Sequence, residues 1–288
     1  CRVLKADEGK VSVEFEVDER MTNHFGTLHG GCSATMVDVI TTGALAASPR
    51  GVPGVSVDLH MTYLAAAKLG DTVQLDAEVI RAGRSMAFTR ASLYRKPDMA
   101  LLATGLHTKV FPVQASVWKQ REGEHPLDPL APSSPSLSSD VNPLFYERMM
   151  RFAQMDKQEA TFSGRVWNAR LTNVEQCKLS AEFVVDQQKI ELFGGTLHGG
   201  CSTTMVDFLT CAALIAATGR PAVSVNLNTT YLAPAPLGTR VRIHAEVVKH
   251  GRSLAYTKAD LIRVEDGVPI ASAKHTLAFN ERVVVREQ

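Results

Sequence analysis

The hydrophobic and polar positions of the chain describe one succession of elements in its first third. Residues 10–17 alternate between apolar and polar side chains, which is the two-residue period of a half-buried strand. A segment rich in small and apolar residues begins at Gly30 and ends before Ser48, and it predicts a buried helix of about 17 residues. Turn residues separate four further predicted strands, at 55–63, 72–80, 85–94 and 101–110. This succession indicates a curved antiparallel sheet wrapped around a central helix, an α+β fold.

The same succession returns in the second half. The predicted elements are strands at 164–171 and 178–185, a helix at 199–217, and strands at 223–231, 240–248, 253–264 and 270–279. Residues 112–142 are rich in proline and serine, which is typical of a linker without a core of its own. Asn142 and Pro143 supply an N-cap and a first-turn proline for a further helix at 144–156. We therefore divide the chain into a first domain at 1–111, a linker at 112–142 and a second domain at 143–288.

The two halves also share their sequence. The stretch from Gly26 to Asp38 is repeated from Gly195 to Asp207 with one substitution, Ala34 against Thr203. Across 26–45 and 195–214, 15 of 20 positions are identical, which indicates an internal duplication.

Composition excludes several classes of partner. Lys and Arg number 31 against 30 Asp and Glu, a net charge of +1, so no bulk attraction to nucleic acid or an anionic membrane is expected. No apolar stretch is expected to provide the roughly 20 uninterrupted residues of a membrane span, which predicts a soluble protein. The five cysteines form no CxxC pair and no even framework. We therefore expect neither zinc nor disulfides, and a reducing compartment.

The amino terminus differs between the copies. The chain begins at Cys1, and the second copy carries residues ahead of its first strand that the first copy lacks. We therefore expect an amino-terminal truncation, which would also remove any targeting segment. Both a cytoplasmic and a mitochondrial location stay open.

An aspartate lies about two turns into each predicted helix, Asp38 and Asp207, among apolar neighbours. Burying a carboxylate costs several kcal/mol unless it is paired or solvated. A capped or hydrogen-bonded structural role is one interpretation, although flanking residues such as Met36 and Val206 offer no obvious cationic partner. We favour a carboxylate that faces a ligand cleft as a base or a nucleophile.

A His-Gly pair precedes each aspartate where the helix starts, at His29-Gly30 and His198-Gly199. The first amide groups of a helix have no intrahelical partner, so they suit an anion or a developing oxyanion. A plain loop-to-helix turn would use the same residues. Each histidine is a candidate general acid, but a histidine beside a helix start more often orients a neighbour.

Two further positions can be compared between the copies. Ser56 and Ser224 occupy identical Val-Ser-Val settings, where they either hydrogen-bond a catalytic group or face the next strand. Three residues before the repeated stretch, the first copy has Asn23 and the second has Leu192. An amide can hold a water or a carbonyl, and a leucine cannot. Whatever Asn23 does, the second copy lacks it.

The other histidines show no metal-ligand spacing with carboxylates, and we expect them at solvated or strand-end positions: His60, His107, His244, His250 and His275. Arg84 and Arg252 flank hairpin turns, and Lys109 follows His107 by two residues. These three cations are candidates for binding phosphates, although charged hairpin tips are the commoner explanation.

The run from Thr22 to Gly31 (TNHFGTLHGG), together with Asp38 and the later runs GVSVD at 54–58 and GRSMAF at 83–88, resembles one family. It is similar to the hotdog-fold acyl-CoA thioesterases of the 4HBT superfamily, in the branch of thioesterase superfamily member 2. The resemblance implies a tandem hotdog fold and hydrolysis of acyl-CoA thioesters. It also implies no cofactor and no metal, since coenzyme A is part of the substrate.

In that family, the Asn and His-Gly of one unit meet the helix Asp and the strand Ser of the other. The resemblance therefore implies a first site made of Asn23, His29, Gly30, Asp207 and Ser224. It implies a second site made of Leu192, His198, Gly199, Asp38 and Ser56. Because Leu192 departs from the family pattern, we expect the second site to be impaired.

We therefore expect an intrachain pseudo-dimer with one competent site for a fatty or aromatic acyl-CoA. Further association into homo-oligomers fits the same resemblance. The alternative is a non-catalytic acyl-CoA binding or regulatory protein in which both sites are degenerate. A hotdog hydratase would need a differently spaced Asp and His pair, which the chain lacks.

Overall fold

The computed structural model describes residues 1–96, 98–111, 134–139, 141–148, 162, 169–189 and 195–280. The first half contains β1 (Arg2–Asp7), β2 (Lys10–Glu16), the 3-10 helix η1 (Glu19–Met21), α1 (Gly30–Ala46), β3 (Val55–Tyr63), β4 (Thr72–Ala82), β5 (Met86–Lys96) and β6 (Ala100–Val110). The second half contains β7 (Ser136–Leu137), a helix at 143–148, β8 (Arg170–Glu175), β9 (Lys178–Val184), α4 (Gly199–Thr218), β10 (Ala222–Tyr231), β11 (Arg240–His250), β12 (Leu254–Arg263) and β13 (Pro269–Phe279).

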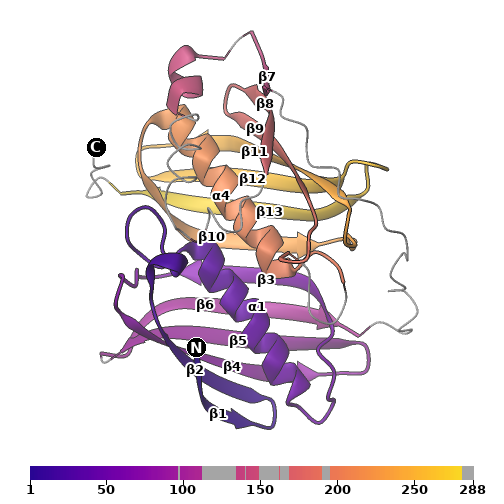
Figure 1. Cartoon of the computed structure of the whole chain (residues 1–288). Helices are drawn as coiled ribbons and strands as arrows, with labels where there is room; N and C mark the ends of the chain where they lie inside the picture. Colours follow the sequence, from indigo (N-terminus) through magenta and orange to yellow (C-terminus); the bar gives the residue numbers. More distant parts are fainter. Residues whose placement is uncertain are drawn as a thin grey trace.

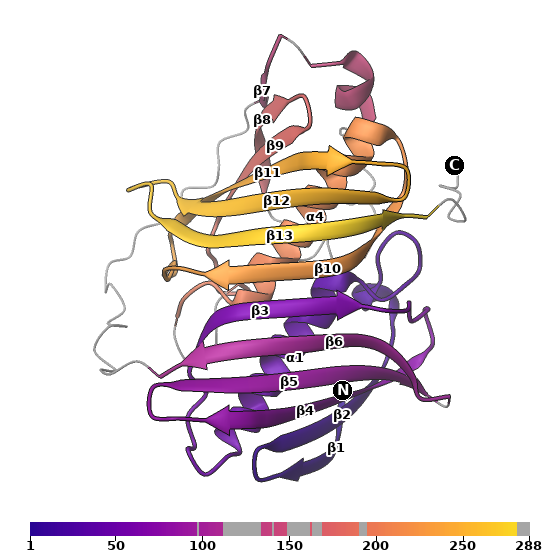
Figure 2. The ribbon, with the colours of Figure 1, turned by 180° about the vertical axis from the view of Figure 1, so that it is seen from behind.

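One sheet runs through both halves. Its 13 described strands follow the order β1-β2-β4-β5-β6-β3-β10-β13-β12-β11-β9-β8-β7. β3 and β10 join the halves as an antiparallel pair, in which Met61 lies opposite Leu227 and both side chains are fully buried. The helices α1 and α4 cross the same face of this sheet (Figure 1), and the view from behind has the strands in front (Figure 2). The predicted antiparallel sheet around a central helix is therefore confirmed in both halves.

The first turns of α1 and α4 touch each other between the two halves. A Cβ atom added at Gly31 would lie 2.8 Å from the Cα of Thr204, and one added at Gly200 would lie 2.7 Å from the Cα of Thr35. The Thr204 hydroxyl donates to the Gly31 carbonyl at 3.1 Å. Backbones approach this closely only where glycine leaves out the side chain. The Gly-Gly pairs of the repeat therefore set the contact between the two helices.

The predicted bounds of α1, α4 and the eight meander strands agree with the observed ones to within about two residues, the usual uncertainty of an element end. Two strands need correction. β1 was not predicted, because all six of its residues are exposed and no burial pattern marks it. The strand predicted at 164–171 overlaps the described strand β8, Arg170–Glu175, only at its last two positions, and residues 164–168 lie outside the described part of the chain. β8 continues beyond the predicted end, where only Val174 is buried and the apolar signal is correspondingly weak.

The region between the copies holds more structure than a linker. Ser136 and Leu137, which fall within the predicted linker, pair in parallel with β8. The helix predicted at 144–156 is helical from 143 to 148, and its remaining residues lie outside the described part of the chain. The Asn142 side chain accepts from the Leu144 amide at 2.8 Å, as the predicted N-cap requires.

α4 meets the length and composition of a membrane-spanning helix, contrary to the expectation that no stretch would. Its mean hydropathy is 1.5, but 83% of the apolar window is buried inside the fold. The apolar character of α4 is thus explained by its position in the core. Its end at Gly219, which has a φ of +69°, uses the left-handed conformation that favours glycine.

Two glycines of α1 provide a matched test of the helix contact. Gly31→Ala should lower the free energy of unfolding by about 1–3 kcal/mol, because the new methyl group overpacks against the Thr204 backbone. Gly43→Ala should raise it by about 0.5–1 kcal/mol, because nothing lies within 4 Å of the added Cβ and alanine favours a helix. Urea denaturation of both variants measures the difference, and a Gly31→Ala variant as stable as Gly43→Ala would contradict the contact.

Candidate active site

His29 is the N-cap of α1. Its Nδ1 accepts a hydrogen bond from the Gly31 amide at 2.9 Å. Burial lowers the pKa of His29, and the nearby Asp207 acts in the opposite direction. His198 caps α4 in the same way, with the Gly200 amide at 3.0 Å. Of the two roles predicted for these histidines, the structure favours orienting the helix start over acting as a general acid.

The Asp207 carboxylate reaches from α4 to the start of α1. Its Oδ2 accepts from the Gly31 amide at 2.8 Å and lies 3.2 Å from His29 Nδ1. Its Oδ1 accepts from the Ser224 hydroxyl of β10 at 2.9 Å. The side chain is 3% exposed, and its charge is therefore balanced mainly by the helix start and the hydroxyl. The structure thus brings His29 of one copy together with Asp207 and Ser224 of the other.

Gly30 lies directly beside Asp207 and Ser224 in this site. A Cβ atom at Gly30 would lie 3.0 Å from Asp207 Oδ2 and 3.2 Å from Ser224 Oγ, so only glycine leaves room there. The Tyr63 hydroxyl donates to the Gly30 carbonyl at 2.8 Å and fixes this turn. No acceptor for the Gly30 amide is found among the described residues. That amide is therefore available to a ligand oxygen.

Asn23 uses one end of its side chain to shape its own loop. Its Oδ1 accepts from the Phe25 amide at 2.9 Å and from the Thr27 amide at 3.2 Å. No acceptor for the Nδ2 group is found among the described residues, so this group can donate to a carbonyl or a water, while Oδ1 is already engaged. Asn23 therefore shapes its own loop, and its role toward a ligand stays a prediction.

A cavity of about 370 Å³ connects these groups. Asn23, Gly30, Asp207 and Ser224 line it together with His29 and Tyr63. Its remaining walls are mainly apolar, from α4, from the start of β10 and from the loop before α1: Leu28, Phe208, Cys211, Ile215 and Ala222. A polar end and an apolar wall in one cavity suit a ligand that is itself part polar and part apolar.

The second copy of the site has the same skeleton and a smaller cavity of about 250 Å³. Asp38 Oδ2 accepts from the Gly200 amide at 2.9 Å and lies 3.4 Å from His198 Nδ1. Ser56 and Gly199 line the cavity. The Ser56 hydroxyl, however, lies 3.5 Å from Asp38 Oδ1, compared with 2.9 Å in the first site. Leu192, on which the predicted impairment rests, lies outside the described residues.

Two further groups contact the Ser56 hydroxyl, Lys109 and His107, and Lys109 is a buried cation. It is 2% exposed, and its Nζ lies 3.5 Å from Asp38 Oδ1, 3.3 Å from Ser56 Oγ and 2.6 Å from Thr42 Oγ1. The prediction that Lys109 binds coenzyme A phosphates is therefore wrong, because its ammonium is inside the fold. The expectation that Asp38 has no cationic partner is wrong as well. Burial raises the pKa of Asp38, but His107, Lys109 and His198 outweigh burial, and the pKa lies well below its usual range.

His107 and His275 are also misplaced by the sequence interpretation. Both were expected at solvated or strand-end positions, and both are 1% exposed beside a site carboxylate. His107 Nε2 lies 3.6 Å from Asp38 and 3.0 Å from Ser56 Oγ, while His275 Nε2 lies 3.5 Å from Asp207. Burial lowers the pKa of both, to about 3 for His107. The signal that sequence reasoning missed is their shared place in the duplicated strand.

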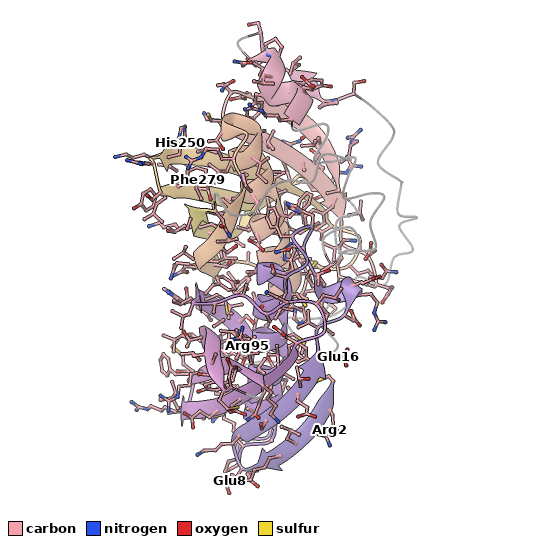
Figure 3. All side chains as sticks on the ribbon, turned by 90° about the vertical axis from the view of Figure 1, so that its left-hand side faces the viewer. Arg2, Glu8, Glu16, Arg95, His250 and Phe279 are labelled. Carbon is pink, nitrogen blue, oxygen red and sulfur yellow. The ribbon has the colours of Figure 1, made fainter. Side chains whose placement is uncertain are left out.

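Arg84 and Arg252 are exposed at the two hairpin turns, as predicted. Each backbone carbonyl accepts from a second arginine, Arg50 in the first half and Arg220 in the second. The Arg220 guanidinium lies 3.8 Å from the ring centre of Phe279, which Figure 3 labels at the edge of the molecule. Phosphate binding by Arg84 and Arg252 stays a prediction.

Two copies of a sheet-wrapped helix, with a buried carboxylate of each facing the helix start of the other, define a double-hotdog protein. The model of the thioesterase superfamily matches residues 25–101 and 194–270, more than half of the chain. The chain therefore belongs to the thioesterase superfamily. This membership places it among enzymes that hydrolyse thioesters.

Relatives agree with this family. Acyl-coenzyme A thioesterase 13 of Homo sapiens is 48% identical over 107 residues, which cover 37% of this chain and 76% of the relative. The protein of the same name from Mus musculus is 43% identical over 107 residues, with the same coverage. A solved structure of a conserved protein of unknown function with a hot dog fold, from Alicyclobacillus acidocaldarius, covers 97% of this chain and 96% of its own. Its TM-score is 0.62 at 15% identity, which supports the fold alone.

The buried ion pair at the second site can be tested by a double-mutant cycle. Lys109→Leu should lower the free energy of unfolding by about 3–5 kcal/mol, because it leaves the Asp38 carboxylate buried without its cation. Adding Asp38→Asn to Lys109→Leu should recover much of that loss, since no buried charge then remains. Urea denaturation at neutral pH measures Lys109→Leu, Asp38→Asn and the double variant. An effect of Lys109→Leu that is equal in the wild type and in the Asp38→Asn background would show that the pair is not coupled.

Proposed function

We propose that the chain is an acyl-CoA thioesterase, which hydrolyses a fatty or aromatic acyl-CoA to the free acid and coenzyme A. The proposal draws on the family, on relatives whose names give this activity, and on the chemistry of the cavity next to Asp207. Five free cysteines suit the reducing interior of the cytoplasm or the mitochondrion, where we place the enzyme. Association of several such pseudo-dimers remains a prediction.

The observation that carries the proposal is the placement of the Gly30 amide, which has no acceptor among the described residues, and of the Asp207 carboxylate at one end of a cavity with mainly apolar walls. The Gly30 amide would donate to the thioester carbonyl and stabilise the negative oxygen that forms when the carbonyl carbon is attacked. Asp207, whose Oδ2 lies next to Gly30, would take a proton from an attacking water or would itself attack that carbon. The C–S bond then breaks. If water attacks, the proton that Asp207 has accepted passes to the coenzyme A sulfur and the free acid is released. If Asp207 attacks, the coenzyme A thiolate takes a proton from solvent, and a water then hydrolyses the acyl-aspartyl anhydride to the free acid and restores the carboxylate.

The neighbouring groups would position these two. Ser224 holds Oδ1 of the carboxylate, so that Oδ2 is directed to the reacting carbon. His29 holds the Gly31 amide and thereby the turn that presents the Gly30 amide. The Asn23 Nδ2 group would donate to the water or to the thioester. Leu28, Phe208 and Ile215 would surround the acyl group, which has to leave water when it enters the cavity.

We further propose that only this first site is competent. The second site has Leu192 in place of Asn23, so it lacks an amide donor for the water or the thioester. Its carboxylate, Asp38, is paired with the Lys109 ammonium, which makes it a weaker base than a carboxylate without such a partner. The second cavity would therefore bind an acyl-CoA without hydrolysing it efficiently. This observation keeps a binding or regulatory role as the second candidate function.

Two matched aspartate variants test the proposed pairing. Asp207→Asn should lower kcat by about 10²–10⁴-fold, because the amide cannot accept a proton in the reaction. Asp38→Asn should leave most of the activity of the folded protein, because its chemistry changes only the impaired site. Since it also leaves the Lys109 ammonium without its carboxylate, folding of this variant is verified first by circular dichroism. Free coenzyme A released from a panel of fatty and aromatic acyl-CoAs measures both. Loss of activity in Asp38→Asn with Asp207→Asn unaffected would reverse the assignment, and no release from any thioester would favour the binding protein.

Leu192→Asn tests what the second site lacks. If the amide is the missing part, the variant should release coenzyme A faster than the wild type, and it should retain measurable activity when combined with Asp207→Asn. The double variant is the informative one, because its first site is silenced and any turnover comes from the second. A double variant as inactive as Asp207→Asn alone would mean that the second site is impaired elsewhere as well, with the Asp38–Lys109 pair as the next cause to test.

A further inference from the structure

The polar cluster behind each site carboxylate differs between the two copies. In the first half, the Lys109 ammonium lies among Asp38, Ser56 and Thr42 and supplies a positive charge inside the fold. In the second half, the equivalent of Lys109 is Leu277 and the equivalent of Thr42 is Cys211. The second half has thus lost a buried cation and gained a thiol beside the carboxylate that remains.

Three donor atoms of different kinds converge where that cation is missing. Asp207, Cys211 and His275 each offer one ligand atom, and the three atoms lie within 4.8 Å of one another. Asp207 Oδ1 is 3.5 Å from His275 Nε2 and 3.8 Å from Cys211 Sγ. Zinc bonds of about 2.0–2.3 Å in a tetrahedron place neighbouring ligands at about 3.3–3.5 Å, so these separations need only small adjustments.

A second observation singles out this cluster. His275 is 1% exposed, and its Nε2 is one of three buried side-chain polar atoms in the described part of the chain without a hydrogen-bond partner. Its other nitrogen is held by the Thr210 hydroxyl at 2.8 Å, which fixes the ring with Nε2 directed to Asp207. In the first half, the corresponding His107 Nε2 has the Ser56 hydroxyl at 3.0 Å. A buried nitrogen left without a partner is costly unless something else binds it.

We propose that Asp207, Cys211 and His275 form a site for zinc or a similar borderline-soft divalent cation, and that the bound cation inhibits the first site. A carboxylate, a thiolate and an imidazole suit zinc, while magnesium and calcium prefer oxygen ligands alone. The thiol loses its proton to solvent on binding, so the carboxylate and the thiolate together balance the two positive charges. Asp207 and Cys211 both line the cavity, which leaves the fourth position open to water or to a thiol.

Inhibition follows from the same geometry, and this part rests on the proposed function. A cation bound to Oδ1 of Asp207 withdraws the carboxylate from its role as base or nucleophile. It also competes with the Ser224 hydroxyl, which donates to that same oxygen at 2.9 Å. The second site is insensitive, because the Lys109 ammonium already fills the corresponding position next to Asp38.

Binding is tested on the full chain, without reference to activity. Zinc is titrated against a chromophoric chelator, and cobalt is added separately to record the thiolate-to-cobalt charge-transfer absorption. We expect one tight site per chain. Removing an outer partner of a metal ligand typically costs about 10–100-fold in affinity. Cys211→Thr, which copies Thr42, removes a ligand itself and should therefore weaken binding by at least about 100-fold and abolish the cobalt absorption.

Two further variants sharpen the binding test. Cys201→Ser is the matched control, since Cys201 is another half-buried thiol of α4 and belongs to no such cluster among the described residues. This variant should bind zinc like the wild type. Leu277→Lys should abolish zinc binding, because it places an ammonium where Lys109 has one in the first half. If this variant fails to fold, the result for Cys211→Thr alone tests the site. A wild type that does not compete for zinc, or a Cys211→Thr variant that binds as tightly, would overturn the proposal.

Inhibition is measured separately, by chromatography of the coenzyme A released. Zinc should inhibit the wild type and Cys201→Ser, and each variant is compared with its own rate in the absence of metal. Cys211→Thr should lose the sensitivity, and magnesium should not inhibit any of them. Zinc binding that is lost in Cys211→Thr but does not affect hydrolysis would support the metal site and would contradict Asp207 as the reacting carboxylate. The two proposals are thereby distinguished.

Discussion

The contact between the starts of α1 and α4 is the constraint on which the rest of the structure depends. Asp38 and Asp207 are buried two turns along their own helices, and a buried carboxylate is stable only if donors surround it. The nearest amide donor for each is the second residue of the other helix, Gly31 or Gly200. Those amides are within reach because the glycines let the backbones touch. Each half therefore completes the polar core of the other.

This mutual dependence explains which residues are identical in the two halves and which differ. The His-Gly-Gly start, the aspartate and the inward-facing histidine are present in both halves, since each contributes to the buried network. The side chains that surround each carboxylate on the side away from the cavity differ between the halves. One half encloses a lysine and a threonine, and the other a leucine and a cysteine, although the surrounding strands and helices follow the same path. Two polar clusters of different charge are thus built on one backbone geometry.

Much of the fold follows from the sequence, because the apolar and polar alternation of the meander and the small-residue helices report burial directly. β1 was not predicted, and the end of β8 was predicted too early, because β1 is exposed throughout and β8 is mostly half-buried, so neither strand shows a clear alternation. The residues around the carboxylates, including His29, Ser224 and Gly30, were anticipated from the repeated motif and the family resemblance. That resemblance also implied which copy pairs with which.

The error over Lys109 has a physical cause. A lysine is rarely buried without a partner, so exposure is the natural expectation for a single lysine near a strand end. The information that argued otherwise was in the spacing: Gly105, His107 and Lys109 alternate along β6, and a Cβ at Gly105 would lie 2.6 Å from Val37 of α1. Residues two apart share a face of a strand. This face of β6 packs against α1, and only the structure shows that packing.

The duplication places both half-sites in one polypeptide, and the pairing of β3 with β10 joins them in one sheet. This arrangement changes how the two sites can vary. In an assembly of two identical chains, any substitution enters both sites at once, so a change that harms catalysis harms it twice. Here Asn23 and Leu192, or Lys109 and Leu277, are separate positions in one gene product. One site can retain its chemistry while the other acquires a different ligand or none, and the shared sheet keeps the two in contact throughout.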